Sequence, residues 1–258
     1  MTGVQKGIKI AANVLAIFII CVIINAILSL VGILGYPGGD NDFIQSYNGI
    51  DNVEIDIGTA NIEIKYGVEF RVEANNVSDN FEVRENNGNL YIEEDGFWIW
   101  GNTGGDIILY VPSELDELNI DTGAGTVVID DIIARKFNLD QGSGTIKISN
   151  SEFYESEIDG GTGNIDVTES ILRDMELDCG VGDVNITAEV LGKSSVSAGV
   201  GSIDLSLNGG EELYTLKIDK GLGNLDINGT GYKSTTYGNG SNKIDIDGGI
   251  GNIDINFN

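Results

Sequence analysis

The sequence has no histidine, two prolines, two cysteines and few basic residues. Without histidine, Ser-His-Asp triads, Cys-His dyads and histidine-containing zinc sites are excluded. Cys21 lies in an apolar segment and leaves Cys179 alone in the rest of the chain, so no disulfide can form within that part. Its stability must therefore come from packing.

Positive charge is also scarce, with 14 basic and 41 acidic residues and a net charge of −27. Lys6 and Lys9 precede the apolar segment and every acid follows it, so the remainder carries 12 basic and 41 acidic residues, a net of −29. Phosphate binding needs Lys and Arg to displace counterions, which excludes nucleic acids and anionic lipids as partners. Binding of cations or of basic partners remains compatible with this charge.

The apolar segment predicts a single membrane anchor. Residues 10–39 carry no charge, and about 20 apolar residues span a bilayer. By the positive-inside rule, Lys6 and Lys9 place the N-terminus in the cytoplasm. A cleaved signal peptide is the alternative, disfavoured by the long apolar run and the lack of an A-x-A site. The expected division is a cytoplasmic tail 1–10, a transmembrane helix 11–35, a linker 36–50 and an extracytoplasmic domain 51–258.

A glycine-led repeat dominates the rest of the chain. First glycines of a G-x-G step fall at positions 123, 142, 161, 180 and 199, a spacing of 19 held four times, and later steps are 22 and 28 residues long. A degenerate copy contains Gly58 and Ala60. Each copy reads Φ-D-x-G-x-G-[N/T/S/D]-Φ-x-Φ, where Φ is apolar. Such regular self-similarity is typical of a solenoid.

The repeat predicts an all-β fold. Apolar and polar residues alternate around each glycine pair, as in half-buried strands, and the glycines suit a sharp turn. We expect coils of about 19 residues over 118–258, stacked about 4.8 Å apart in a β-solenoid. A second apolar stripe completes each coil, at Ile132/Ile133, Phe153, Ile171/Leu172 and Val190/Leu191.

The residues between the glycines grow larger toward the C-terminus, and we expect their side chains to point inward. They are Thr59, Ala124, Ser143, Thr162, Val181, Val200, Leu222 and Ile250.

Segment 68–111 departs from the repeat and is predicted to be an N-terminal cap or a lateral sheet. It contains two strand-like runs around Asn87-Gly88, typical of a hairpin, and a further strand over 107–111 before Pro112. Its aromatic run Phe97–Trp100 could plug the open end of the core or form an exposed binding tip. We favour the plug.

The D-x-G-x-G-N-Φ-x-Φ copies, with the strand that ends at Pro112, resemble the toastrack-type family of bacterial adhesin-like proteins of unknown function. The resemblance covers about residues 50–258, and the layout is also similar to membrane-anchored proteins of cell-envelope stress systems. It implies a β-solenoid displayed at the bacterial cell surface. It offers no catalytic residues to transfer.

An aspartate recurs two residues before the first glycine. The column comprises Asp56, Asp121, Asp140, Asp159, Asp178, Asp219 and Asp247, with Ser197 interrupting it. Carboxylates are Ca²⁺ ligands, and residues 160–166 come close to a calcium-binding β-roll motif, although the aspartate falls one place late. Structural capping of the turn is the favoured alternative. A second column contains Asp166, Asp204, Asp226 and Asp254.

Two features near the C-terminus could support binding. The 28-residue step inserts about nine residues around Tyr232, Lys233, Tyr237 and Lys243, either a loop or a decorated face. The last copy runs to Phe257 with no visible polar cap, which predicts open strand edges and end-to-end association.

The sequence therefore favours a non-enzymatic, membrane-anchored scaffold or interaction module, acting as an adhesin or in envelope sensing. The first alternative is a Ca²⁺-responsive surface module, and the second a polysaccharide-active enzyme on a β-helix, whose paired acids should depart locally from the repeat. No catalytic, cofactor or metal residue is assigned. The expected partners are the membrane and an unidentified envelope protein or glycan.

Overall fold

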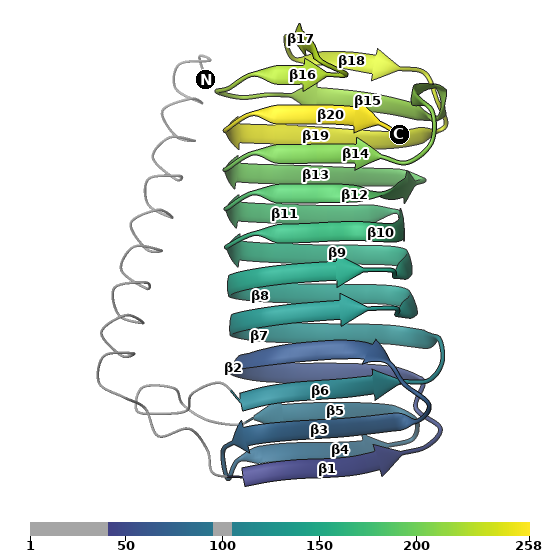
Figure 1. Cartoon of the computed structure of the whole chain (residues 1–258), viewed down its shortest axis with the longest axis vertical. Helices are drawn as coiled ribbons and strands as arrows, with labels where there is room; N and C mark the ends of the chain where they lie inside the picture. The colour runs from purple at the N-terminus through teal and green to yellow at the C-terminus, as the bar shows by residue number, and fades with distance from the viewer. Residues whose placement is uncertain (1–40, 95–104) are drawn as a thin grey trace, which may run out of the picture. The chain divides into compact units, whose positions relative to one another are not determined.

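The computed structural model describes residues 41–94 and 105–258, which form 20 strands and one short 3₁₀ helix (Figure 1). The N-terminal strands are β1 (Asn41–Tyr47), β2 (Asn52–Tyr66), β3 (Phe70–Val77), β4 (Phe81–Asn86), β5 (Asn89–Glu94) and β6 (Gly105–Val111). The central strands are β7 (Leu115–Asp130), β8 (Ile133–Ser149), β9 (Glu152–Thr162), β10 (Ile165–Arg173), β11 (Met175–Val181), β12 (Val184–Leu191), β13 (Lys193–Val200) and β14 (Ile203–Leu207). After η1 (Glu211–Leu213) follow β15 (Tyr214–Asp219), β16 (Leu225–Ile227), β17 (Thr230–Tyr232), β18 (Thr235–Gly238), β19 (Asn242–Ile250) and β20 (Ile253–Phe257).

The predicted all-β stack of coils is confirmed. Each coil has one strand before its glycine turn and one after it, and we call these two sides the first and second faces. β7 and β8 run through the turn from one face to the other and pair in parallel, 19 residues apart, from Leu115↔Ala134 to Asp130↔Ser149. The same shift pairs β9 with β11, and β10 with β12 up to Thr168↔Thr187, after which a bulge shortens the shift by one residue. The constant spacing thus sets the register of the ladder.

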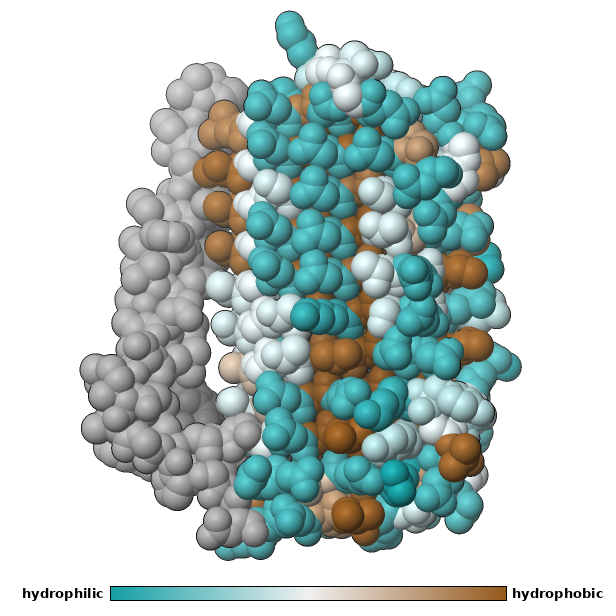
Figure 2. All heavy atoms as spheres, in the orientation of Figure 1, coloured by the Kyte–Doolittle hydropathy of each residue, from teal (hydrophilic) through white to brown (hydrophobic). Residues whose placement is uncertain are grey.

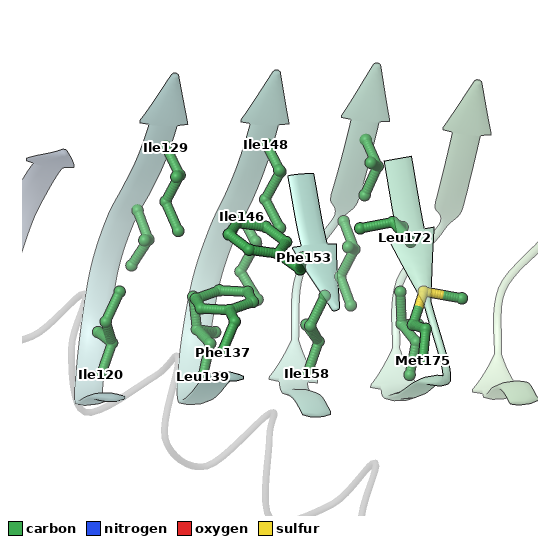
Figure 3. Packing of buried hydrophobic residues seen from close by; sticks show 14 of the residues in the cluster. Ile120, Ile129, Phe137, Leu139, Ile146, Ile148, Phe153, Ile158, Leu172 and Met175 are labelled. Atoms are coloured by element: carbon green, nitrogen blue, oxygen red, sulfur yellow. The ribbon is translucent and has the colours of Figure 1, made fainter. Parts of the chain in front are cut away.

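The core lies between the two faces (Figure 3). Every second side chain of each strand points inward, so the inner residue of one coil packs on that of the next, as with Leu139 and Ile158. The predicted second stripe is buried at Ile132, Phe153, Leu172 and Val190, and Phe153 stacks on Phe137 with ring centroids 4.4 Å apart. The neighbours in its pairs are not core residues, because Ile133 is exposed and Ile171 and Leu191 are half-buried. Neighbouring coils therefore supply the burial that no coil could provide alone.

The second glycine of each turn is required by the approach of the coil below. Gly163 has φ +138°, and a Cβ there would overlap the carbonyl oxygen of Gly144. Gly144 stands in the same relation to Gly125. This positive φ also breaks the strict in-and-out alternation of the strand.

The expectation that the residue between the glycines points inward is wrong. Leu222 is 72% exposed and Ile250 is 44% exposed, while Val181 and Val200 are half-buried. The chain turns the corner at this residue, so its side chain projects from the edge of the stack instead of continuing the inner column. Larger side chains fit here because the edge is open, not because the core widens.

Buried serines close the opposite corner of the coil. Ser151 accepts a hydrogen bond from the Ile132 amide, and Ser170 accepts one from the Ser151 amide, each at 3.2 Å. Ser194 accepts from the Met175 amide at 3.1 Å. These hydroxyls satisfy amides that the corner removes from the ladder, as buried backbone groups require.

At the N-terminal end the stacking order departs from the chain order. β2 pairs in parallel with β7 on one side and with β5 and β6 on the other, so it lies inside the stack. The predicted hairpin is present as β4–β5, with positive φ at Asn87 and Gly88. The predicted strand before Pro112 is β6, and β3 and then β1 add to it in antiparallel fashion. Residues 41–47, expected as linker, are thus the outermost strand on the second face.

At the C-terminal end the same departure occurs, and it corrects the prediction of an open last coil. β19 lies between β13 and β15, and β20 lies between β14 and β16 (Figure 1). The coil that ends the sequence is therefore flanked on both sides. The insertion forms β17 and β18, which pair antiparallel with β16 and β15 and cover the last parallel edge.

Two expectations fall outside the described residues: the span at 11–35 and the aromatic run 97–100. Within residues 41–94 and 105–258, no helix is long and apolar enough to span a membrane.

Candidate functional site

The aspartates predicted as a column lie in one row on the first face. Along the stack this row, which we call the carboxylate row, contains Glu93, Asp56, Asp121, Asp140, Asp159, Asp178, Ser197, Asp247 and Asp219. All seven predicted aspartates are therefore brought together on one surface. Glu93 joins them through β5, which sequence spacing could not show, and intercalation of β19 reverses the last two.

Like charges in the row affect one another. Burial, and then the charge of Asp121, raises the pKa of the Asp140 carboxyl. Burial raises the pKa of Asp159 too, followed by the charges of Asp178 and Asp140. Within the described parts of the chain, no basic side chain pairs with Asp121, Asp140 or Asp159. The centre of the row is thus a strip of uncompensated negative charge.

A second row runs beside the first, two residues earlier on each strand. In stacking order it contains Glu54, Asn119, Asn138, Glu157, Glu176, Ser195, Asp245 and Lys217. Asn138 donates a 2.6 Å hydrogen bond to Asn119. From Glu54 to Asp159 the two rows line a shallow hollow of about 400 Å³, whose lining includes six carboxylates: Glu54, Asp56, Asp121, Asp140, Glu157 and Asp159.

The rows change character at β13, where both carry serine. Ser197 donates a hydrogen bond to Asp178, and beyond β13 Lys217 pairs with Asp245 at 3.3 Å. A second hollow of about 590 Å³ opens here, lined by Ser195, Ser197, Asp247 and hydroxyls of β18. Because this end of the first face mixes donors and acceptors with the cations Lys193, Lys217 and Lys243, it is less negative than the middle.

Carboxylates on adjacent strands of the ladder, which we call rungs, do not form a metal site. Ca²⁺ takes six to eight oxygen ligands at 2.3–2.6 Å, whereas each rung contributes one aspartate and rungs lie about 4.8 Å apart. Within the described residues, no three Asp, Glu or Cys side chains converge as a metal site. The row can attract cations, but the calcium motif suggested by residues 160–166 corresponds to no preformed site among them.

The second predicted column lies on the second face. Asp166, Asp204, Asp254 and Asp226 follow one another there, with Asn185 between the first two. Asn185 donates a 2.7 Å hydrogen bond to Asp166, and burial, followed by the charge of Asp254, raises the pKa of Asp204. An amide thus interrupts these carboxylates, and they form a shorter row than those of the first face.

The lone cysteine of this part of the chain is a core residue. Cys179 is 3% exposed, and burial raises the pKa of its thiol to about 11. Reactive cysteines have a lowered pKa and access to solvent. Cys179 therefore fills space near the turn and offers no reactive thiolate.

The residues between the glycines, which are exposed or half-buried, form a continuous ridge along the turn edge. Parallel pairing orders them Thr59, Ala124, Ser143, Thr162, Val181, Val200, Ile250 and Leu222. The first four are polar or small and the last four are apolar, so half of this turn ridge is hydrophobic (Figure 2). The sequence contained this signal, but the expected alternation assigned it to the core.

Comparison with known structures gives distant likenesses. A "putative adhesin" from Bacteroides fragilis is 14% identical with a TM-score of 0.45, over 86% of this chain and 100% of that one. A "putative cell adhesion protein" from Clostridium sporogenes is 14% identical with a TM-score of 0.36, over 84% and 99%. A "putative lipid binding protein" from Parabacteroides distasonis is 14% identical with a TM-score of 0.36, over 84% and 98%. The comparison with curated proteins gives no match.

The family comparison is more specific. The model of the family described as Toastrack DUF4097 matches residues 52–256, which include every coil of the stack and both of its intercalated ends. The resemblance inferred from the glycine-led copies is thereby confirmed, and the chain belongs to the toastrack family DUF4097.

Proposed function

We propose that this chain is a non-enzymatic interaction module, anchored in the membrane by residues 11–35, whose extracytoplasmic stack binds a basic partner through the carboxylate row. One observation carries the proposal: the row repeats the same charged group, in register, over successive rigid rungs. Such an array suits a partner with many positive charges, because complementary potentials guide association and set its register.

The regularity of the first face supports binding over catalysis. A glycosidase needs two carboxylates at a defined separation and in different environments. The clearest break in both rows occurs at Ser195 and Ser197, where carboxylates are replaced by hydroxyls. An active site would appear as a local departure from the repeat that contains two carboxylates in different environments. The departure seen here removes carboxylates instead.

The test compares two variants with equal loss of charge. The first, D121N/D140N/D159N, neutralises the centre of the carboxylate row, and the control, D166N/D204N/D254N, neutralises the second face. With the full chain in nanodiscs and oligolysine as the probe, we expect the first variant to bind roughly tenfold more weakly, from about 0.5 kcal/mol per charge. The control should stay close to wild type.

The salt dependence of the same binding reaction adds a second measurement. Increasing NaCl should weaken oligolysine binding to the wild type and reduce the difference between the variants. Equal weakening by the two triple variants would attribute binding to net charge alone and would overturn the assignment to this row.

The calcium-responsive module is the second candidate, because burial, followed by neighbouring carboxylates, raises the pKa values of Asp140 and Asp159, and a bound cation would relieve this penalty. Millimolar CaCl₂ should raise the unfolding midpoint of the wild type, but not that of D121N/D140N/D159N, if the row binds the ion. An unchanged midpoint in the wild type would exclude this candidate.

A further inference from the structure

The apolar half of the turn ridge is a row of four projecting side chains, which we call the knobs: Val181, Val200, Ile250 and Leu222. On each side of this row lies a strip of glycines without side chains, which we call a glycine strip. Each of its residues stands between two glycines, as in Gly180-Val181-Gly182 and Gly221-Leu222-Gly223. The second glycine of the regular turns cannot carry a side chain, because its Cβ would overlap a carbonyl of the neighbouring coil. A Cβ on the first glycine would also approach a neighbouring carbonyl closely, as at Gly180 and Gly199. Stacking of the turns therefore leaves no side chain on either side of the row.

The spacing of the row restricts what can fit against it. Val181, Val200, Ile250 and Leu222 lie on consecutive rungs, about 4.8 Å apart. An α-helix presents successive turns about 5.4 Å apart, so its side chains drift out of step with these rungs. A second copy of the same ridge has the same spacing, with knobs and glycine strips in matching positions.

We propose that this apolar half of the turn ridge is a self-association surface, on which a second copy of the chain packs across a two-fold axis. The four knobs of each copy lie in the glycine strip of the other. An isologous contact of this kind uses the same patch on both partners, as closed dimers do. This proposal goes beyond the binding of a basic partner and uses a different surface.

Charge and size define the strength of this contact. Asp178 and Asp183 flank the ridge, so two copies bring like charges together at the rim. Four side chains bury far less than the roughly 800 Å² per partner of a standard interface. The association is therefore weak and salt-promoted, and it depends on the high local concentration that a common membrane would provide.

Cysteine cross-linking in proteoliposomes tests the proposal on the full chain. V200C places a thiol in the middle of the knobs, and C21S removes the thiol of the apolar segment, while Cys179 is buried. The matched control, S143C with C21S, places the thiol at the same turn position on the polar half. We expect oxidation to link two copies of V200C/C21S through position 200 at least about tenfold faster than it links the control, and faster still as NaCl rises.

A second substitution checks the apolar contact itself. Leu222 is exposed and outside the core, so L222D in the V200C/C21S background should leave the fold intact and reduce the dimer about tenfold, while T162D should leave the dimer unchanged. Equal cross-linking of V200C and S143C, or insensitivity to L222D, would overturn the proposal.

The natural Cys21 distinguishes another occupant of the ridge. If the apolar segment of the same chain covers these residues, V200C with Cys21 retained will form an intrachain disulfide, detectable by mass spectrometry of the monomer. That result would also overturn the proposal. Oligolysine binding requires the carboxylate row and weakens with salt, so the two proposals can fail independently.

Discussion

The middle and the ends of the stack are built from the same unit but follow different orders. From β7 to β14 each coil lies beside its neighbour in sequence, with a shift of 19 residues that only a bulge in β10 interrupts. At the ends the order changes. β2 lies between strands that all follow it in the chain, and β19 and β20 lie between strands that all precede them. A spacing of 19 residues therefore places each coil next to the one before it in the sequence. A longer step allows the chain to extend past a position in the stack and later insert a strand there.

Antiparallel strands at the two ends replace a long open parallel edge with short edge strands. A parallel ladder that simply stopped would expose a row of unpaired amides and carbonyls. Here the outermost strands at both ends pair antiparallel, with β4 on β5 and β1 on β3 at one end and β17 and β18 at the other. The coils nearest the two chain termini are held from both sides as a result.

Removing the last coil should have the largest effect of any change at the ends. Deletion of residues 242–258 takes away the parallel neighbours of β15 and β16, whereas deletion of 209–258 leaves an intact parallel stack ending at β14. We expect the shorter deletion to abolish hydrogen-exchange protection over 214–238, and the longer one to keep protection over 115–190. If residues 214–238 remain protected without β19 and β20, the intercalated order is not required for the end to fold.

The sequence predicts the middle well for a physical reason. Two glycines, an aspartate and alternating apolar residues repeat at one spacing, and each has a local cause in turn geometry or burial. The order of Asp219 and Asp247 in the carboxylate row could not be predicted, because pairing between β13 and β19 is a contact across 50 residues that no local pattern encodes. Alternation also failed at Val200, because the positive φ of the next glycine reverses the side.

Glycine substitutions should separate the regular turns from the degenerate one. Gly163 in the middle has positive φ and abuts Gly144, so G163A should lower the free energy of unfolding by about 5 kcal/mol or more. At Gly58 nothing lies within 4 Å of an added Cβ, so G58A should change the free energy of unfolding by less than about 1 kcal/mol. Urea unfolding monitored by circular dichroism measures both. Comparable losses at the two positions would show that close stacking is not what requires glycine.

Aromatic substitutions compare the core of the middle with the cap at the end. Phe137 is fully buried against Phe153, so F137A should cost about 3–4 kcal/mol. Tyr237 is only half-buried, stacks on Phe257 and donates to Glu211, and Y237A should cost about 1 kcal/mol. The unfolding midpoints of the two variants give the ranking. A reversed ranking would mean that the cap, not the middle, holds the stack together.

Acidic pH provides the finest comparison, because the middle stacks carboxylate on carboxylate whereas the end pairs Lys217 with Asp245. The folded-state pKa values of Asp140 and Asp159 are raised, so ionisation at neutral pH disfavours the folded state at these positions. That penalty decreases as pH falls through the raised pKa values and vanishes below the ordinary value of 3.8. At neutral pH D140N/D159N should therefore be slightly more stable than wild type, and the difference should shrink toward pH 3.8.

Asp130 supplies a control of opposite sign in the same coils. Hydrogen bonds from Ser149 and then Asn150 lower the pKa of Asp130, so its ionised form stabilises the fold above the ordinary value of 3.8 and this contribution is lost as pH falls through the lowered pKa. D130N should therefore be less stable than wild type at neutral pH, with a deficit that disappears in acid. Unfolding midpoints of both variants between pH 3 and 7 measure the two slopes. If both slopes had the same sign, they would report a general effect of net charge, and the burial and like-charge contacts of Asp140 and Asp159 would not be what distinguishes the middle from the ends.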